Sequence, residues 1–94
     1  MSEKIVSVKI LVKGIVQGVG FRWFVKNIAE EENIKGYVKN NYDGSVEIVA
    51  ETTNNAVLER FVERIKKEHP QALINSIEIS YITPVCYKDF KIKF

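Results

Sequence analysis

The chain has 94 residues, 46% of them hydrophobic, and its 14 basic and 12 acidic residues leave a net charge of +2. This length predicts one domain, residues 1–94, with enough apolar side chains for a single core. The balance of charges argues against a nucleic-acid partner, because nucleic-acid binders usually carry a strong basic excess on one face.

Cysteine content and hydropathy indicate the cellular compartment in which the protein is expected. The single cysteine, Cys86, cannot form an intramolecular disulfide, which is typical of proteins in a reducing compartment. No apolar run approaches the roughly 20 residues of a membrane span, and residues 1–4 do not lead into the apolar stretch of a signal peptide. We therefore expect a cytoplasmic protein with no membrane partner.

The first half of the chain predicts a strand, a loop, a helix and a hairpin. Residues 5–13 alternate between polar and apolar side chains, as in a half-buried strand. Three glycines in the seven residues 14–20 predict a shaped loop. From Phe21 the apolar residues recur with the period of a helix, which we expect to end near Glu32 and Asn33. Strands are predicted at 37–40 and 45–51, joined by a tight turn at Asp43 and Gly44.

The second half predicts one helix and two strands. Thr52, Thr53 and Asn54 are candidate N-caps of a helix that runs to about Glu68, before Pro70. A fourth strand is predicted near 77–81 and a short closing strand near 90–94. Because each helix has one apolar stripe to bury, we predict an α+β, ferredoxin-like β-α-β-β-α-β sandwich, with both helices on one face of an antiparallel sheet. This fold alone specifies no function.

The loop at residues 14–20 has the features of an anion site. It connects a strand to a helix N-terminus, where unpaired backbone N–H groups and the helix dipole favour negative charge. Arg22 lies in the first turn of this helix, where a cation is unfavourable unless an anion is bound, and its planar guanidinium can hold two phosphate oxygens. No nucleotide-binding glycine motif is present, since Trp23 occupies the place of a third glycine. From the residues alone, a simple tight turn and a solvated arginine remain open alternatives.

Two segments resemble the signatures of the acylphosphatase family. Residues 14–22, Gly-Ile-Val-Gln-Gly-Val-Gly-Phe-Arg, resemble the first signature, and residues 36–40, Gly-Tyr-Val-Lys-Asn, resemble the second. The length of the intervening helix and the hairpin at 43–48 also match, and the resemblance fades over residues 52–85. Ile15 departs from the family, since many members have a polar or basic residue there.

The resemblance implies an enzyme that hydrolyses acyl phosphates to a carboxylate and inorganic phosphate, without a cofactor or a metal. It implies that Arg22 and the backbone of the loop bind the phosphoryl group, and that Asn40 positions the attacking water. The loop residues concerned are Val16, Gln17, Gly18, Val19 and Gly20. The substrate is then a small acyl phosphate, which the sequence does not specify further.

Five other features invite attention. His69 is the only histidine and has no neighbouring metal-ligand pattern, so we expect a structural or exposed side chain and no metal site. Cys86 lacks a base nearby in sequence and is expected to be a passive thiol. Gln17 is open to two roles, as a substrate ligand or in holding the loop. Trp23 is either a wall of the site mouth or a surface aromatic, and the glutamates at 30–32 are expected to form a solvated helix end.

Three alternatives compete with an independent enzyme. An RNA-binding module needs aromatic residues on the central strands, whereas residues 45–51 carry acids and aliphatics. A domain that passes carbamoyl phosphate within a larger maturation enzyme is not expected in a chain of 94 residues. A non-catalytic phosphate- or small-molecule-binding module would bind phosphate without turning over benzoyl phosphate. A monomer is expected, because Lys91 and Lys93 would discourage edge-to-edge strand pairing.

Overall fold

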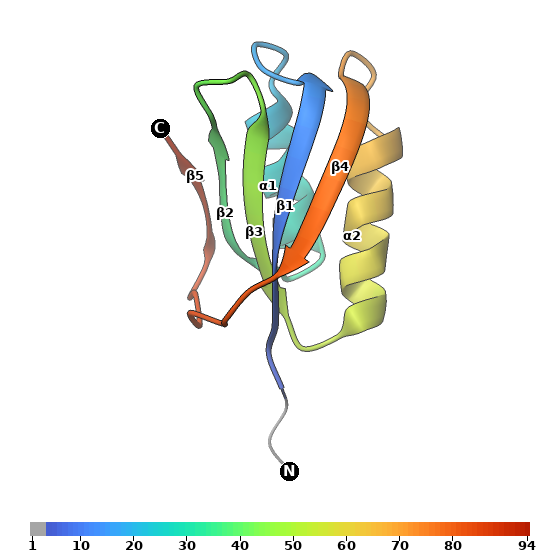
Figure 1. The fold of residues 1–94 in the computed structure, drawn as a ribbon. Coiled ribbons are helices and arrows are strands. Elements are labelled where there is room, and N and C mark those ends of the chain that lie inside the picture. The colour runs from blue at the N-terminus through green and yellow to red at the C-terminus, as the bar shows by residue number, and fades with distance from the viewer. Residues whose placement is uncertain (1–3) are drawn as a thin grey trace.

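The computed structural model describes residues 4–94, which fold into five strands and two helices (Figure 1). Residues 1–3, part of the segment in which the sequence shows no secretion signal, lie outside the described residues. In chain order the elements are β1 (Val6–Ile15), α1 (Phe21–Glu31), β2 (Lys35–Asn40), β3 (Val46–Thr52), α2 (Asn55–Lys67), β4 (Leu73–Tyr81) and β5 (Phe90–Lys93). Neither described helix is long and apolar enough to cross a membrane.

The strands form a single sheet in the order β4-β1-β3-β2-β5. The pairs of β1 with β3, β1 with β4 and β2 with β3 are antiparallel, whereas β2 and β5 are parallel. The predicted α+β, ferredoxin-like fold is confirmed, and the closing strand makes the sheet mixed. The strand β4 finishes at the end of the sheet at which β2 begins. From there the chain crosses that end of the sheet and enters β5, which therefore runs parallel to β2 (Figure 1).

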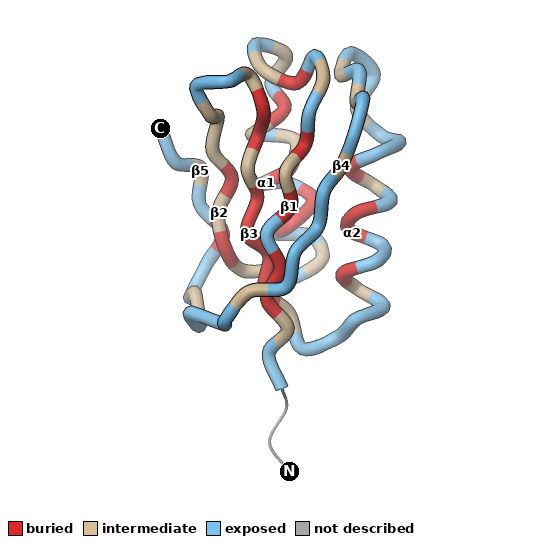
Figure 2. The backbone as a smooth tube through the Cα atoms, in the orientation of Figure 1, coloured by how far each residue is buried: buried red, intermediate tan, exposed pale blue. Residues whose placement is uncertain are grey.

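The core lies between the sheet and the two helices, as the apolar periods of the sequence predict. Strand residues at alternate positions point inward, and Val8, Ile10 and Val12 of β1 are no more than 1% exposed. They meet the buried stripes of the helices, which are Phe21, Val25, Ile28 and Ala29 in α1 and Leu58, Phe61, Val62 and Ile65 in α2. Burial therefore runs along the central strands and one side of each helix (Figure 2).

The N-termini of the two helices differ in how their backbone N–H groups are satisfied. Asn54 caps α2, since its Oδ1 accepts from the N–H groups of Ala56 at 2.8 Å and Val57 at 3.3 Å. Helix α1 begins after Gly20, which makes no side-chain cap, and its first turn contains no acidic residue. The N-terminus of α1 is therefore left electropositive and uncapped.

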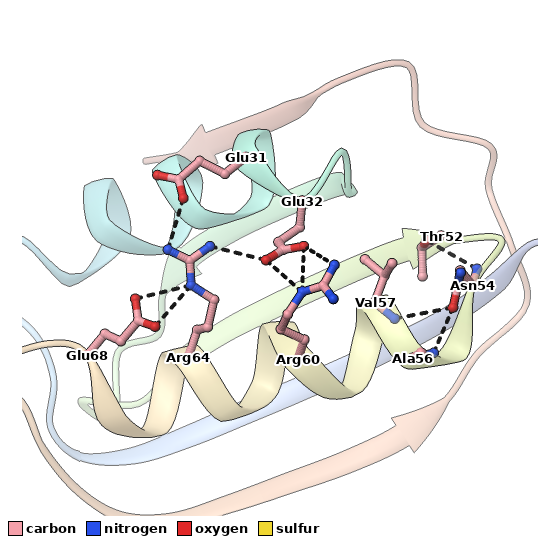
Figure 3. A network of polar contacts seen from close by, with 9 residues as sticks. All are labelled: Glu31, Glu32, Thr52, Asn54, Ala56, Val57, Arg60, Arg64 and Glu68. Carbon is pink, nitrogen blue, oxygen red and sulfur yellow. Dashed lines mark hydrogen bonds and ion pairs between the residues drawn. The ribbon is translucent and has the colours of Figure 1, made fainter.

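The acidic end of α1 forms an ion-pair network with α2 (Figure 3). Glu32 accepts from Nε of Arg60 at 2.9 and 3.0 Å and from Nη2 of Arg60 at 2.7 Å, and its Oε2 accepts from Arg64 at 3.2 Å. Arg64 also contacts Glu31 at 2.9 Å and Glu68 at 3.1 Å. The expected solvated helix end holds for Glu30 and Glu31, which are exposed, and is corrected for Glu32, whose side chain is 11% exposed. Glu31 and Glu32 also join the two helices, because α2 packs beside α1 and presents its arginines to them.

Three loops that are distant in sequence lie together at one end of the molecule (Figure 1). They are the β1–α1 loop, the β2–β3 turn and the α2–β4 connection. Helix α1 begins at this end of the molecule, so the fold places its uncapped N-terminus beside the turn that follows β2.

Candidate active site

The β1–α1 loop is held at its start by a buried side chain and exposes its backbone afterwards. Val16 is 1% exposed and belongs to the core. Gly18 and Gly20 have φ angles of 78° and 73°, in the left-handed region that glycine adopts without strain. A Cβ at either glycine would meet nothing within 4 Å. Glycine is thus required here by backbone conformation, and a ligand can approach the loop closely.

A cavity of about 90 Å³ lies where this loop meets α1 and β2. Its lining residues are Val16, Gln17, Gly18, Gly20, Phe21, Arg22, Trp23 and Asn40. The structure thus brings together every residue that the sequence predicted for the site except Val19. Trp23, which is 59% exposed, lines the cavity, in agreement with the first of its two proposed roles.

Backbone N–H groups are available beside this cavity. In α1 the N–H of Phe24 donates to the carbonyl of Gly20 at 3.1 Å, which is the first bond of the helix. The N–H groups of Phe21, Arg22 and Trp23 precede it and have no carbonyl within the helix to accept from them. An oxyanion in the cavity would satisfy such donors and would also meet the positive end of the helix dipole.

The guanidinium of Arg22 is held loosely by the C-terminal residues. Its Nη1 donates to the carbonyl of Lys93 at 3.3 Å, and its Cζ lies 5.0 Å from the centre of the Phe94 ring. This single hydrogen bond occupies one of five N–H donors, so a phosphate can still be held by two of them at once. The contact of Arg22 with β5 carries no local sequence signal, because it joins residues 71 positions apart.

Asn40 brings an acceptor with no partner to the cavity. It is the last residue of β2, where its backbone pairs with Val46 of β3. Its Oδ1 is buried, and no group within residues 4–94 donates to it. An unpaired buried acceptor costs about 1–3 kcal/mol, so it indicates a site that is completed by a ligand or a water.

Gln17 joins the loop to the β2–β3 turn. Its Nε2 donates to the carbonyls of Asn41 at 2.8 Å and Ser45 at 2.9 Å. The turn is itself ordered by Asp43, whose Oδ1 accepts from the N–H of Ser45 at 3.0 Å and from its hydroxyl at 2.6 Å. The side chain of Gln17 therefore holds the loop in place, which was one of the two roles left open by the sequence.

His69 contacts the loop from the α2–β4 connection. Its Nε2 lies 2.9 Å from the carbonyl oxygen of Val19, fifty positions earlier in the chain. The expected structural role of this histidine is confirmed, and its contact with the loop is a feature that the sequence did not reveal. Cys86 is exposed in the connection before β5 and is not among the residues that line the cavity. Among the residues that the structure describes, no group of three His, Cys, Asp or Glu side chains could hold a metal ion.

A larger hollow of about 460 Å³ opens at the opposite end of the molecule, beside Cys86, Tyr87 and Asn54. The acidic groups on its wall already have partners. Glu51 accepts from the backbone N–H groups of Val85 at 2.7 Å and Tyr87 at 2.9 Å, and Glu32 is paired with Arg60. Groups able to bind an anion converge instead in the smaller cavity at Arg22.

Comparisons with known proteins identify the family of this chain. The acylphosphatase family model matches residues 8–92. The acylphosphatase of Thermotoga maritima is 47% identical over 88 residues, which are 94% of this chain and 97% of that protein. The crystal structure of acylphosphatase from Bacillus subtilis superposes with a TM-score of 0.90 at 37% identity, over 95% of this chain and 99% of that one. Full-length HypF, in a phosphate- and nucleotide-bound form, contains a similar region: the TM-score is 0.92 at 39% identity, over all of this chain and 12% of that one. The chain therefore belongs to the acylphosphatase family.

Proposed function

We propose that this acylphosphatase binds the phosphoryl group of its substrate with Arg22 and the backbone N–H groups of the loop, and that Asn40 orients the attacking water. The overall reaction is hydrolysis of a carboxyl phosphate to a carboxylate and inorganic phosphate. The observation that carries the proposal is the convergence of Arg22, an uncapped helix N-terminus and the unpaired Oδ1 of Asn40 on one cavity. The proposed backbone donors lie in residues 16–20.

Phosphoryl transfer to water mainly requires positioning and stabilisation of charge on the phosphoryl oxygens. Two N–H groups of Arg22 can hold two of these oxygens, and loop amides can hold the third. Donors that are already oriented stabilise the transition state without reorganising during the reaction. The leaving group is a carboxylate, which departs without a general acid, and the cavity lining contains none.

Asn40 suits the orientation of a neutral nucleophile. Its Oδ1 can accept a hydrogen bond from water and leave an oxygen lone pair directed at phosphorus. The residues that line the cavity include no Asp, Glu or His to act as a base. We therefore assign the proton of the water to an oxygen of the phosphate itself. Substrate binding thus supplies both the electrophile and the proton acceptor.

We further propose that the chain acts as a monomer in the cytoplasm. Lys91 and Lys93 lie on β5, the outer strand on one side of the sheet, where charge opposes pairing with a second sheet. The lone, exposed Cys86 is compatible with a reducing compartment. Sedimentation analysis tests the first proposal, since a dimer at micromolar concentration would contradict it. Cell fractionation tests the second, since recovery outside the cytoplasm would contradict it.

Steady-state hydrolysis of benzoyl phosphate, with inorganic phosphate as competitive inhibitor, tests the residue roles. Arg22→Lys should lower kcat/KM at least about 100-fold and raise the Ki for phosphate, because an ammonium does not replace two parallel N–H donors. Asn40→Ala should lower kcat by about 100-fold with little change in the Ki for phosphate, since it removes a contact to water. Arg60→Lys and Asn27→Ala, which alter the same residue types outside the cavity, are the matched controls.

Full activity in Asn40→Ala would exclude its assignment to the water. Binding of phosphate by the wild type without turnover of any acyl phosphate would support a non-catalytic module instead. The family assignment does not favour that alternative.

A further inference from the structure

His69 occupies a position between the phosphate loop and the connection that follows α2. We propose that His69 is a positioning residue, which directs the backbone N–H of Gly20 at the phosphoryl group by holding the preceding carbonyl, that of Val19. This inference rests on the proposed binding of phosphate by the loop. It assigns no contact with the substrate to His69 itself.

The hydrogen bonds of the ring define its tautomer. Nδ1 accepts from two backbone N–H groups, those of Gln71 and Ala72, each at 3.1 Å. A nitrogen that faces two donors must carry its lone pair and no proton, so the proton of the neutral ring is on Nε2. The contact of 2.9 Å between Nε2 and the Val19 oxygen is therefore an N–H donor to a carbonyl acceptor.

The geometry of the peptide unit transmits this contact to the cavity. The Val19 carbonyl and the Gly20 N–H belong to the same peptide, and no described peptide is cis. In a trans peptide the C=O and N–H bonds point in opposite directions. The N–H of Gly20 is thus directed away from His69. Gly20 lines the cavity, whereas Val19 does not, so the side of this peptide that faces away from His69 is the side of the phosphate site.

The side chain of Val19 packs against the core, but the glycines on either side of it leave the orientation of this peptide plane less restricted. The residues on either side of Val19 are Gly18 and Gly20, both with positive φ and with open space where a Cβ would be. Glycine rotates its peptide planes more freely than other residues, so a loop of this kind needs a contact that selects one orientation. The bond from His69 supplies it, and it also polarises the peptide so that the Gly20 N–H becomes a better donor.

The ring of His69 is itself held in place by packing. It meets the ring of Phe24 edge-on, with centroids 4.9 Å apart and planes at 85°, and lies 5.9 Å from the ring of Phe21. Phe21 is 1% exposed and belongs to the core. His69 therefore connects the Gly20 amide to the core through its contacts with Phe21 and Phe24.

Two substitutions separate the two hydrogen-bonding edges of the ring. In His69→Asn the Oδ1 can still accept from the N–H groups of Gln71 and Ala72, but the side chain is too short to reach Val19. In His69→Gln the Nε2 can still donate to the Val19 carbonyl. Gln71→Ala retains the backbone N–H that contacts His69 and is the control for the connection.

The readouts are the KM for benzoyl phosphate, the Ki for inorganic phosphate and the NMR shift of the Gly20 amide during a phosphate titration. We expect His69→Asn to raise the KM and the Ki roughly tenfold, as for a weakened hydrogen bond to a charged group, and to reduce the Gly20 shift. His69→Gln should restore most of the affinity, and Gln71→Ala should resemble the wild type.

Equal Ki values for His69→Asn and the wild type would overturn the inference. So would an equal loss in the Asn and Gln variants, because ring packing would then be responsible. If neither variant folds, wild-type spectra decide: a Gly20 amide that phosphate does not shift, or a neutral His69 ring with its proton on Nδ1, overturns the inference. A shifted Gly20 amide together with a proton on Nε2 of His69 supports it. The proposed function fails separately, if Arg22→Lys leaves the Ki for phosphate unchanged.

Discussion

The side-chain amide of Gln17 donates to the backbone carbonyl of Asn41 at 2.8 Å, and so links the phosphate loop to the residue that follows Asn40. A second bond from the same nitrogen, to Ser45 at 2.9 Å, closes this link across the β2–β3 turn. The proposed phosphate-binding loop and the proposed water-orienting residue therefore share one rigid connection. Their relative position depends on a side chain that has no proposed part in the chemistry.

This connection predicts a clear order among substitutions of Gln17. Both Gln17→Ala and Gln17→Glu remove the donor to the two carbonyls, and Gln17→Glu should be the more harmful because its carboxylate also places negative charge against these carbonyls and beside the phosphate site. We expect Gln17→Ala to lower the free energy of unfolding by about 1–2 kcal/mol and kcat/KM roughly tenfold. Urea unfolding and benzoyl phosphate kinetics measure both effects. Activity of Gln17→Ala equal to that of the wild type would show that the link is not needed, and activity of Gln17→Glu at or above that of Gln17→Ala would contradict the predicted order.

Trp23 predicts a preference among acyl groups. It lines the cavity next to Arg22 and exposes 59% of its surface, so an apolar acyl group that projects from the cavity would contact its ring. We expect Trp23→Ala to raise the KM for benzoyl phosphate roughly five- to tenfold, with a much smaller effect on acetyl phosphate. The Ki for inorganic phosphate should not change, since phosphate lacks an acyl group. Equal effects on both substrates would place the acyl group elsewhere.

The carboxylate of Glu51 holds the segment that leads into the C-terminal strand. Although it lies on the face of β3 opposite the helices, it is only 3% exposed, because the connection between β4 and β5 covers it. Its Oε2 accepts from the N–H groups of Val85 at 2.7 Å and Cys86 at 3.4 Å, and its Oε1 accepts from Tyr87 at 2.9 Å.

Glu51→Gln should therefore lower the free energy of unfolding by about 2 kcal/mol, since an amide NH₂ would face a backbone donor that has lost its acceptor. Urea unfolding measures the loss, with the exposed Glu59→Gln as control. If hydrogen exchange in Glu51→Gln, relative to the wild type, increases more in residues 85–93 than in β3, the loss of stability lies in the C-terminal segment. Unchanged stability in Glu51→Gln would mean that water satisfies these amides equally well.

The ion pairs of Glu32 should make the stability of the fold depend on pH in the acid range. Hydrogen bonds from Arg60 lower its pKa below the usual 4.5, partial burial opposes this, and Arg64 lowers the pKa further. A carboxyl whose pKa is lower in the folded state stabilises the protein above its unfolded pKa, and this stabilisation is lost as the pH falls through the folded pKa. We expect Glu32→Gln to be less stable at pH 7 and to lose less stability than the wild type as the pH falls below about 4.5. Urea unfolding at a series of pH values measures the slope, and an unchanged slope would contradict the assignment.

Much of the fold could be predicted because its signals are local. The alternation in β1 and the helical period from Phe21 each reflect burial of one side of an element against the same core. Asn54 and Pro70 set the ends of α2 for reasons confined to a few neighbouring residues. The parallel pairing of β5 with β2 had no such signal, because it depends on where the chain crosses after β4.

The candidate site also contains residues that local sequence could predict and one residue that it could not. The glycine loop and Arg22 are adjacent in sequence, so their conformation and charge could be interpreted without a structure as an anion site. Asn40 entered only through the family resemblance, since an asparagine at the end of a strand carries no distinctive pattern. The buried, unpaired state of its Oδ1 is a property of the packing around it.

The sequence by itself determined the elements, the apolar faces and the chemistry of the β1–α1 loop, because backbone propensity and amphipathic period act over a few residues. Only the tertiary structure decided that Asn40 shares a cavity with Arg22, that Glu51 is covered by residues 85–87 and that His69 holds the carbonyl of Val19. Each of these contacts joins segments that are at least 18 positions apart in the sequence. Such contacts form only when the collapse of the whole core brings separate loops to the same end of the sheet.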